Sequence, residues 1–391
     1  MTRRRAWPVL LTALVLTVMS GLLLPGPASA DEIWGEKTIY TNMVSGGDGT
    51  RTPDIIATSA NNAVVVWREG LRPGNVDMGY VRYSYTTDGG ANWSRPQMLA
   101  QETSEWAWHY VVLHKVGSTL YAFLGRTPIR DDEPDGKDEK EGFPTDGINH
   151  NGLPINGTFL KRSTDQGHSW QDVPDASFPD MKNLALSGRP APGLINGEHV
   201  MPYWASPREN GVLLSSDMKT WRKGGSVRNG NDPTVLAGEN QIAVSQDDPT
   251  KLVMVARSKD NAAWSTGTYQ SASKTWKWDD FIHDPVLHSD NIARPFFTKD
   301  GNGQYLYIYN RGTGFYGDRD ILDYKTRRPG AAWSAAKDFA NGSDPEDTAG
   351  TGKGWDNYPM ADEYAPGKFW VVWEFDTTRI KMKRLDISGA P

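Results

Sequence analysis

Residues 85–94 read YTTDGGANWS, and residues 162–170 read RSTDQGHSW. Both follow one pattern: Ser or Thr, any residue, Asp, any residue, Gly, two further residues, then Trp. The Asp stands five residues before the Trp in each copy (Asp88 and Trp93, Asp165 and Trp170). Residues 215–221, SSDMKTW, form a shorter third copy without the Gly. Residues 271–276 and 328–334 are decayed copies that lack the Asp.

The Trp residues of these five copies are 77, 51, 55 and 57 residues apart. Between them lie short runs rich in Val, Tyr, Trp and Phe, separated by Gly, Pro, Asn or Asp, as is typical of β-strands. A period near 50 residues with several short strands in each repeat indicates propeller blades. The runs are Ala63–Trp67, Met78–Thr86, Leu120–Leu124, Leu252–Ala256, Tyr305–Tyr309 and Phe369–Phe375.

The repeated motif has the composition of a hairpin turn. Asp and Ser or Thr side chains bond backbone amides, Gly accepts positive φ, and Trp packs beneath. We therefore interpret the motif as structural. It resembles the Asp-box (BNR) repeat of the sialidase (neuraminidase) family, which implies an all-β, six-bladed β-propeller. Five marked blades and a final sheet near residues 355–387 make six, and we expect a strand around Ile33–Tyr40 to close the ring.

Composition excludes several classes of protein. The 40 Gly and 25 Pro make up about 17% of the 391 residues, against roughly 12% usually, which disfavours a mostly helical chain. The absence of Cys excludes disulfides and thiolate metal sites. The net charge is −6, whereas a nucleic-acid binder would present a basic face.

Residues 1–30 have the pattern of a signal peptide. Arg3, Arg4 and Arg5 precede an apolar run that ends at residues 25–30, PGPASA, where small residues form a cleavage-like site. A transmembrane anchor is the competing interpretation, and Pro8 and the cleavage-like end disfavour it. We expect residues 31–391 to be secreted as a single propeller domain, without stable membrane insertion and as a monomer.

Two segments, 130–157 and 341–356, have the composition of long loops. The first is rich in Asp and Glu, but it lacks the ligand spacing of a helix-loop-helix calcium site. We interpret it as a solvated loop and expect no metal and no cofactor.

Blade one contains residues 49–57, GTRTPDIIA, and then residues 64–77, VVVWREGLRPGNVD. This order resembles the sialidase family, in which an Arg-Ile-Pro motif, a second Arg and an Asp precede the first Asp box. Arg51, Arg72 and Asp77 match those positions, while Thr52 stands where the family usually has Ile. The resemblance implies that Arg51 and Arg72 bind substrate and that Asp77 is the acid/base.

Two later segments continue the match in chain order. Residues 238–257 resemble the family's Glu-Asn-x-Val segment and the strand ending in Arg. The resemblance implies that Glu239 is the partner of the nucleophile and that Arg257 binds the substrate carboxylate. Residues 355–374 resemble Tyr-Ser-x-Leu followed by a strand ending in Tyr-Glu. Tyr358 would then be the nucleophile with Glu239 as its partner, and Glu374 would hold Arg51. Each of these residues also has an ordinary structural interpretation, as a surface Arg, a turn acid or a packed Tyr.

The third carboxylate-binding Arg should come from blade five, where the spacing does not align cleanly. We select Arg319, with Arg311 as the alternative. Residues 106–110, WAWHY, depart from the family's usual second blade, so His109 is a further candidate, although a packed histidine is the commoner case.

These residue types suit the chemistry of an acidic sugar. Guanidinium groups bind a carboxylate through paired hydrogen bonds, and a neutral Tyr nucleophile avoids repulsion by that carboxylate. The resemblance therefore predicts a secreted exo-α-sialidase that acts with retention on sialylated glycans or other acidic sugars. Two alternatives stay open. One is another exo-glycosidase or a uronate lyase that uses His109 and a Tyr, and the other is a carbohydrate-binding propeller without turnover.

Overall fold

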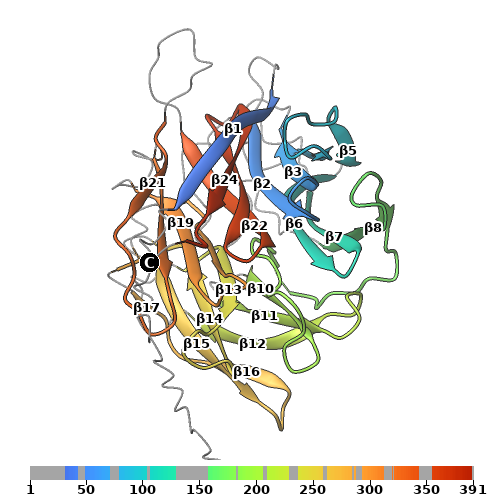
Figure 1. Cartoon of the computed structure of the whole chain (residues 1–391). Helices are drawn as coiled ribbons and strands as arrows, with labels where there is room; N and C mark the ends of the chain where they lie inside the picture. Colours follow the sequence, from blue (N-terminus) through green and yellow to red (C-terminus); the bar gives the residue numbers. More distant parts are fainter. Residues whose placement is uncertain are drawn as a thin grey trace, which may run out of the picture.

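The computed structural model describes residues 31–42, 49–70, 79–103, 106–128, 157–181, 184–205, 209–228, 237–258, 262–283, 286–287, 293–311, 319, 321–342 and 355–389. Within these residues the chain forms 24 β-strands and no α-helix. The strands make six antiparallel sheets around a common centre (Figure 1). The predicted all-β, six-bladed propeller is confirmed. The expected signal peptide and most of the two expected loops lie outside the described residues.

The sheets follow one another along the chain, and we number them as blades 1–6. Blade 1 contains β2 (Thr50–Ala57), β3 (Ala63–Glu69), β4 (Tyr80–Thr86) and β5 (Gln97–Ala100). Blade 2 contains β6 (Trp106–Val116), β7 (Thr119–Pro128), β8 (Thr158–Ser163) and β9 (Gln171–Asp172). Blade 3 contains β10 (His199–Ala205), β11 (Glu209–Ser215) and β12 (Arg222–Arg228).

The second half of the ring is built in the same way. Blade 4 contains β13 (Asn240–Val244), β14 (Lys251–Ala256), β15 (Ala263–Gln270) and β16 (Thr275–Trp278), and β17 (Ile282–His283) also pairs with β15. Blade 5 contains β18 (Phe296–Lys299), β19 (Tyr305–Asn310), β20 (Leu322–Arg327) and β21 (Lys337–Ala340). Blade 6 contains β22 (Asp356–Ala365), β23 (Lys368–Phe375), β24 (Arg379–Asp386) and β1 (Glu32–Thr41).

The first and last described strands share blade 6. Strand β1 pairs antiparallel with β24 and forms the outer strand of a sheet otherwise made by the last 35 described residues (Figure 1). Glu36 on β1 forms ion pairs with Lys381 and Lys383, at 3.2 and 2.6 Å. The predicted closing strand is therefore confirmed, and it covers an edge of β24 that would otherwise be exposed.

Blade 3 has an irregular inner segment in place of a fourth strand. Ala185 forms an isolated bridge with Trp204 of β10, and the amide of Ala191 donates to the carbonyl of Val200 at 2.9 Å. Residues 184–191 thus occupy the innermost place of blade 3. This segment delivers Arg189 to the centre of the ring.

The first two Asp boxes lie between the third and fourth strands of their blades, and the third box lies between β11 and β12, the last two strands of blade 3. In the second box, Ser163 Oγ donates to Asp165 at 2.7 Å, and the amide of Ser169 donates to Asp165 at 3.0 Å. Although burial acts to raise it, these hydrogen bonds lower the pKa of Asp165 to about 2. The motif is a turn closed by its own side chains, as the sequence predicted.

Each of the first three boxes also fastens its blade to the preceding one. Trp93 of blade 1 packs edge-on against Trp370 of blade 6, with ring centroids 6.2 Å apart. Trp170 packs on Tyr83, and Trp221 packs on Phe123, again one blade back. The repeat therefore supplies the contact between neighbouring blades as well as the turn.

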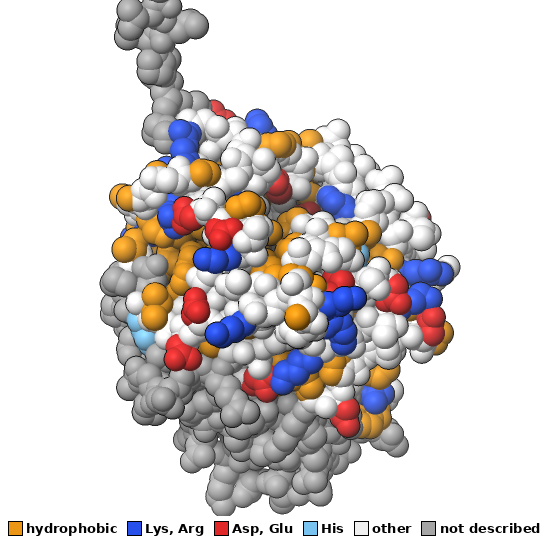
Figure 2. Space-filling view, turned by 90° about the horizontal axis from the view of Figure 1, so that it is seen from below, with side chains coloured by type: hydrophobic (Ala, Val, Ile, Leu, Met, Phe, Trp, Pro, Cys, Tyr) orange, Lys and Arg blue, Asp and Glu red, His pale blue; other side chains and the backbone are white. Residues whose placement is uncertain are grey.

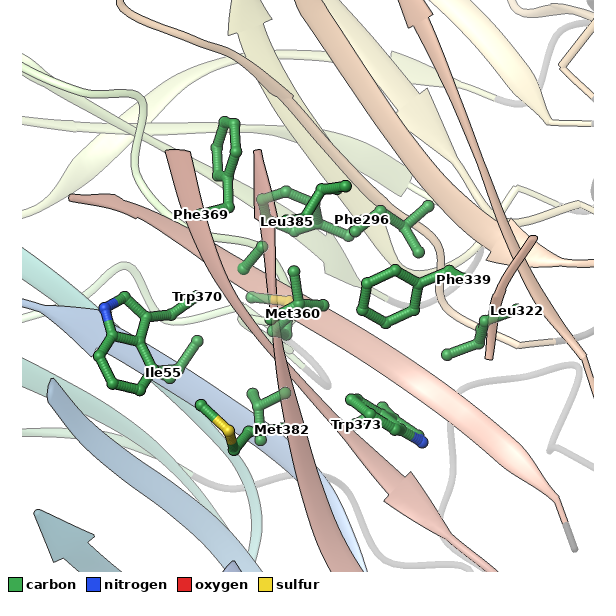
Figure 3. Close-up of a cluster of buried hydrophobic side chains, with 14 of the residues drawn as sticks. Ile55, Phe296, Leu322, Phe339, Met360, Phe369, Trp370, Trp373, Met382 and Leu385 are labelled. Carbon is green, nitrogen blue, oxygen red and sulfur yellow. The ribbon is translucent and has the colours of Figure 1, made fainter. Parts of the chain in front are cut away.

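The hydrophobic core lies between the blades, whose middle strands are covered on both faces. Every side chain of β3 is buried. The largest cluster joins blades 1, 5 and 6 and includes Ile55, Phe339, Met360, Trp370 and Trp373 (Figure 3). This packing holds the inner strands β2 and β22 side by side, and their starting ends carry several of the predicted site residues.

The surface mixes side chains of both charges. On the face seen in Figure 2, Lys and Arg side chains are interspersed with Asp and Glu, and hydrophobic side chains gather between them. Among the described residues, no helix is long and apolar enough to span a membrane. The same part of the chain contains no group of three or more His, Asp or Glu side chains that could hold a metal ion.

The glycine of the second box gives a test of the fastening role. Gly167 has φ = 86°, and a Cβ placed there would lie 2.3 Å from Cγ2 of Val64 on β3. We expect Gly167→Ala to lower the free energy of unfolding by about 2–4 kcal/mol, because backbone strain and overpacking add. Urea unfolding measures this change.

Gly117, in the turn between β6 and β7, is the matched control. It has φ = 58°, and a Cβ there would meet no atom within 4 Å. Gly117→Ala should therefore cost only the backbone strain, about 1–2 kcal/mol. Equal losses in the two variants would show that contact with the neighbouring blade contributes nothing.

Candidate active site

In three inner strands, the regular hydrogen-bonded pairing with the neighbouring strand is interrupted near the end that carries the predicted site residues. The pairing shifts between Arg51 and Asp54 in β2, between Trp108 and Val111 in β6, and between Asn357 and Met360 in β22. Such bulges turn side chains away from the regular alternation of a strand. Here they present residues of blades 1, 2 and 6 to the centre of the ring.

Two of the bulges contain a non-glycine residue with positive φ followed by proline. Thr52 has φ = 46° and precedes Pro53, and Tyr358 has φ = 49° and precedes Pro359. Proline cannot donate a ladder hydrogen bond, which favours an interruption of the strand at both places. A left-handed Tyr costs of order 1–3 kcal/mol, and such strain concentrates at functional sites.

Tyr358 is buried, and its hydroxyl lies beside a buried ion pair. Arg257 Nη1 lies 3.3 Å from the Tyr358 hydroxyl and donates to Glu239 Oε2 at 2.5 Å. Tyr110 of β6 donates to Glu239 Oε1 at 3.3 Å. Glu239 and Tyr358 form no hydrogen bond with each other, so Arg257 links the two groups that the sequence proposed as nucleophile and partner.

The electrostatics keep the Tyr358 phenol protonated at neutral pH. Burial raises its pKa, the Glu239 charge raises it further, and the charges of Arg257 and Arg319 oppose the rise. Burial acts to lower the pKa of Arg257, but the negative charges of Glu239 and of an ionised Tyr358 act to raise it, and the pKa is raised. A cation therefore stays next to a neutral phenol, where it would stabilise the phenolate once a base removes the proton.

Glu374 at the end of β23 holds the start of β2. Its Oε2 accepts a hydrogen bond from the Thr52 amide at 2.8 Å, and its Oε1 lies 3.9 Å from Arg51 Nη1. Glu374 is fully buried, whereas the Arg51 side chain remains 15% exposed. The sequence proposed Glu374 as the partner of Arg51, and the two side chains lie within ion-pair distance of each other.

The structure separates the two arginines considered for blade 5. Arg319 is buried, and its guanidinium lies 5.9 Å from the ring centroid of Tyr358. Burial lowers the pKa of Arg319, and its titratable neighbours include the Tyr358 phenol, Arg257, Glu374 and Arg51. Arg319 thus belongs to the same group of side chains.

Arg311 lies elsewhere. Its side chain is 46% exposed and forms ion pairs with Asp323 and Asp338 of blade 5. It is therefore held away from Tyr358 by the outer strands of its own blade.

Two predicted site residues, Arg72 and Asp77, lie outside the described residues. Gly79, two residues after Asp77, exchanges backbone hydrogen bonds with Trp108 at 2.9 and 3.2 Å. Trp108 immediately precedes His109, whose ring packs against Tyr110 at a centroid distance of 4.1 Å. The unusual WAWHY segment therefore runs beside the chain that leads out of the predicted acid/base loop.

Sequence reasoning missed Arg294. This residue is buried, and its guanidinium lies 5.6 Å from the Tyr358 ring centroid. It donates to the carbonyl of Ser187 at 3.0 Å and to that of Pro53 at 3.3 Å. The sequence contained one signal for this residue: Arg294 stands directly before Pro295 and β18, and between Arg257 and Arg319 in chain order.

Sequence reasoning also missed Tyr110. The sequence signal for Tyr110 was its place in the WAWHY segment, from which His109 was the predicted candidate. The geometry makes Tyr110 the residue of that segment that bonds Glu239.

Comparison with known protein families agrees with the propeller fold. The BNR repeat-like domain family matches residues 61–365. This chain belongs to that family. No curated protein sequence matches the chain.

Solved structures similar to this BNR-repeat protein include sialidases. A Dyadobacter fermentans protein of unknown function has a TM-score of 0.67 at 16% identity, over 91% of this chain and 99% of its own. The Hadza microbial sialidase Hz136 has a TM-score of 0.62 at 16% identity, over 88% of this chain and 66% of its own. The intramolecular trans-sialidase of Ruminococcus gnavus has a TM-score of 0.59 at 14% identity, over 90% and 97%. This BNR-repeat protein therefore has a sialidase-type propeller.

The buried ion pair beside Tyr358 gives a stability test. Arg257→Met leaves the Glu239 carboxylate buried without its cation, so we expect a loss of about 3–5 kcal/mol in the free energy of unfolding. Adding Glu239→Gln removes the uncompensated charge, and the double variant should recover most of the loss. A double variant less stable than Arg257→Met would contradict this account.

Proposed function

We propose that the protein is an exo-α-sialidase that hydrolyses terminal sialic acid from glycoconjugates with retention. The observation that carries the proposal is the set of guanidinium groups around one buried phenol. Arg257 and Arg319, from two different blades, lie next to Tyr358, and Arg51 belongs to the same charged group through Glu374. Sialidase-type neighbours support the same function.

The charge balance explains why this arrangement suits a sialic acid. The sugar carries a carboxylate on its anomeric carbon, and planar guanidinium groups can bind it through paired hydrogen bonds. We assign this task to Arg51, Arg257 and Arg319, with Arg72 beside them. A carboxylate nucleophile would be repelled by the same anionic centre, whereas a neutral phenol approaches without that penalty.

The reaction then needs a base for the phenol and an acid for the leaving group. Glu239 is the base that takes the Tyr358 proton, which requires the Arg257–Glu239 contact to adjust when substrate binds. The Tyr358 oxygen bonds to the anomeric carbon as the bond to the leaving oxygen breaks, and Asp77 protonates that oxygen. Asp77 next deprotonates water, which displaces Tyr358, so two inversions give net retention.

We further propose that residues 1–30 direct secretion and are removed, so that the protein acts outside the cell as a monomer. Glycoconjugates with terminal sialic acid are its expected substrates, and this chemistry requires no metal and no cofactor.

The direct test is turnover by purified residues 31–391. We expect release from a methylumbelliferyl sialoside and from sialyllactose. Tyr358→Phe should lose activity on both substrates, because it removes the nucleophile. Asp77→Asn should reduce kcat by about 10²–10⁴-fold on sialyllactose and less on the activated glycoside, whose phenol leaves without protonation. A folded protein with no release from either substrate, or a Tyr358→Phe variant with full turnover, would contradict the proposal.

The two blade 5 arginines provide a matched pair. Arg319→Lys replaces a planar fork by a point charge next to Tyr358, so we expect kcat/KM to fall by about 10²–10³-fold. Arg311→Lys keeps a cation beside Asp323 and Asp338 and should leave kcat/KM within about twofold. The reverse order of effects would transfer the carboxylate-binding role to Arg311.

One observation favours a second candidate, a lyase acting on uronate polysaccharides. His109 and Tyr110 are in ring contact, and Tyr110 bonds Glu239. A His–Tyr pair could remove the proton next to a uronate carboxylate held by the same arginines. The lyase would produce an unsaturated uronate, which a rise in ultraviolet absorbance would detect. Binding to sialylated glycans without turnover would instead indicate a carbohydrate-binding propeller that is not an enzyme.

A further inference from the structure

A buried arginine lies at the Tyr358 ring without a carboxylate of its own. Arg294 is 1% exposed, and its guanidinium carbon lies 5.6 Å from the ring centroid of Tyr358. Across the described ranges, Arg294 has no carboxylate within the 4.0 Å of an ion pair. A guanidinium stays charged in proteins, and a buried charge is unfavourable unless other groups compensate it. The surroundings of Arg294 therefore indicate what this charge is for.

Two backbone carbonyls hold the guanidinium in place. Nη1 donates to the carbonyl of Ser187, on the inner segment of blade 3, at 3.0 Å. Nη2 donates to the carbonyl of Pro53, on β2 of blade 1, at 3.3 Å. Because both terminal nitrogens donate to the protein and the side chain is buried, Arg294 is not placed to bind the carboxylate of a substrate. Its role differs from the one assigned to Arg51, Arg257 and Arg319.

The acids nearest to these contacts are directed at other groups. Asp54 follows Pro53 in the chain, and it accepts from Arg189 Nε at 2.9 Å. Among the contacts of Arg294 in the described part of the chain, Tyr358 is the group that can acquire a negative charge. The two acids that act on Tyr358 also have partners: Glu239 accepts from Arg257 at 2.5 Å, and Glu374 accepts from the Thr52 amide at 2.8 Å.

Arg257 and Arg294 contact different parts of Tyr358. Arg257 Nη1 lies 3.3 Å from the hydroxyl, whereas Arg294 is within cation–π distance of the ring. The ring quadrupole already attracts a cation when the phenol is neutral. When the phenol loses its proton, the oxygen and the ring share a full negative charge, and the attraction becomes that of an ion pair in a site with little water.

We propose that Arg294 is a positioning residue for the nucleophile, which holds the Tyr358 ring and provides a fixed counter-charge when the phenol ionises. The role in turnover rests on the proposed sialidase function, whereas the coupling of Arg294 to Tyr358 does not require it. In turnover, Glu239 takes the phenol proton and Arg294 keeps its own. Arg294 then stabilises the phenolate before it attacks the anomeric carbon and again when water displaces it.

The coupling is measured without substrate in residues 31–391 that carry 3,5-difluorotyrosine at position 358. This phenol is more acidic than that of tyrosine, so fluorine NMR can follow its ionisation while the protein stays folded. In Arg294→Gln, we expect the pKa of this phenol to lie at least about one pH unit above its value with Arg294 present, because a nearby cation is lost. Arg294→Lys keeps the cation and should show less than half of that rise. A role in packing alone would raise the pKa equally in both variants, since both lose the guanidinium fork.

Arg327 provides the matched control. Its guanidinium lies 6.0 Å from the ring centroid of another tyrosine, Tyr305 at the start of β19, so Arg327→Gln should leave the titration at position 358 unchanged. If Arg294→Gln does not fold, the ¹⁵Nε signal of Arg294 reports the same coupling in the protein that keeps this arginine. The signal missing in Arg294→Lys identifies it, and it should shift with the same pH midpoint as the phenol. Equal titrations with Arg294 and with Gln, or an Arg294 signal that does not respond to the phenol, would overturn the proposal.

Turnover of sialyllactose tests the catalytic consequence. Arg294→Gln should lower kcat by about tenfold or more without raising KM, because Arg294 contacts the nucleophile and not the substrate. Arg294→Lys should recover part of the loss. A raised KM with unchanged kcat would overturn the proposal, because it would make Arg294 a substrate-binding residue. If the protein with Arg294 releases no sialic acid, the sialidase function fails, and the titration at position 358 still decides whether Arg294 is coupled to the phenol.

Discussion

The ion pair of Arg189 with Asp54 and Asp362 crosses the axis of the propeller and joins three blades. Arg189 Nε donates to Asp54 at 2.9 Å, and Nη1 donates to Asp362 at 2.9 Å and to the carbonyl of Ala361 at 2.6 Å. Asp54 also accepts from the amide of Leu113 on blade 2, at 2.7 Å. Removing one member of such a buried group would leave uncompensated charge, at a cost of about 3–5 kcal/mol. The group fixes β2, β22 and the inner segment of blade 3 relative to one another.

The candidate active site depends on this constraint because it is assembled from the same strands. Asp54 lies two residues beyond Thr52, where the Glu374 contact begins, and Asp362 lies four residues beyond Tyr358. The bulges and the positive φ values of Thr52 and Tyr358 are local departures from regular strand geometry. The ion pair of Arg189 with Asp54 and Asp362 and the hydrophobic core between the blades stabilise these departures. A buried phenol among guanidinium groups is unfavourable for each member alone, and packing and charge from several blades keep them together.

Much of this arrangement could be predicted from the sequence, because its signals are local. The Asp box is a turn whose hydrogen bonds join residues within five positions, so its pattern survives in the sequence and marks the blades. Glu239, Arg257, Tyr358 and Glu374 could be located because chain order in a propeller becomes position around the ring. Arg294 and Arg189 could not be located, since their roles come from contacts with residues 64 to 241 positions away in the sequence. The choice between Arg311 and Arg319 also required geometry, because outer-strand partners decide which one turns inward.

The central claim is that Tyr358 attacks the anomeric carbon of a sialoside. The most direct measurement is peptide mass spectrometry after reaction with a 3-fluorosialosyl fluoride, in which the electronegative substituent slows breakdown of a glycosyl-enzyme intermediate. The account predicts one adduct per chain on the peptide that contains Tyr358, and no adduct in Tyr358→Phe. A protein that turns over sialosides but carries the adduct on another residue, or carries none, would contradict it.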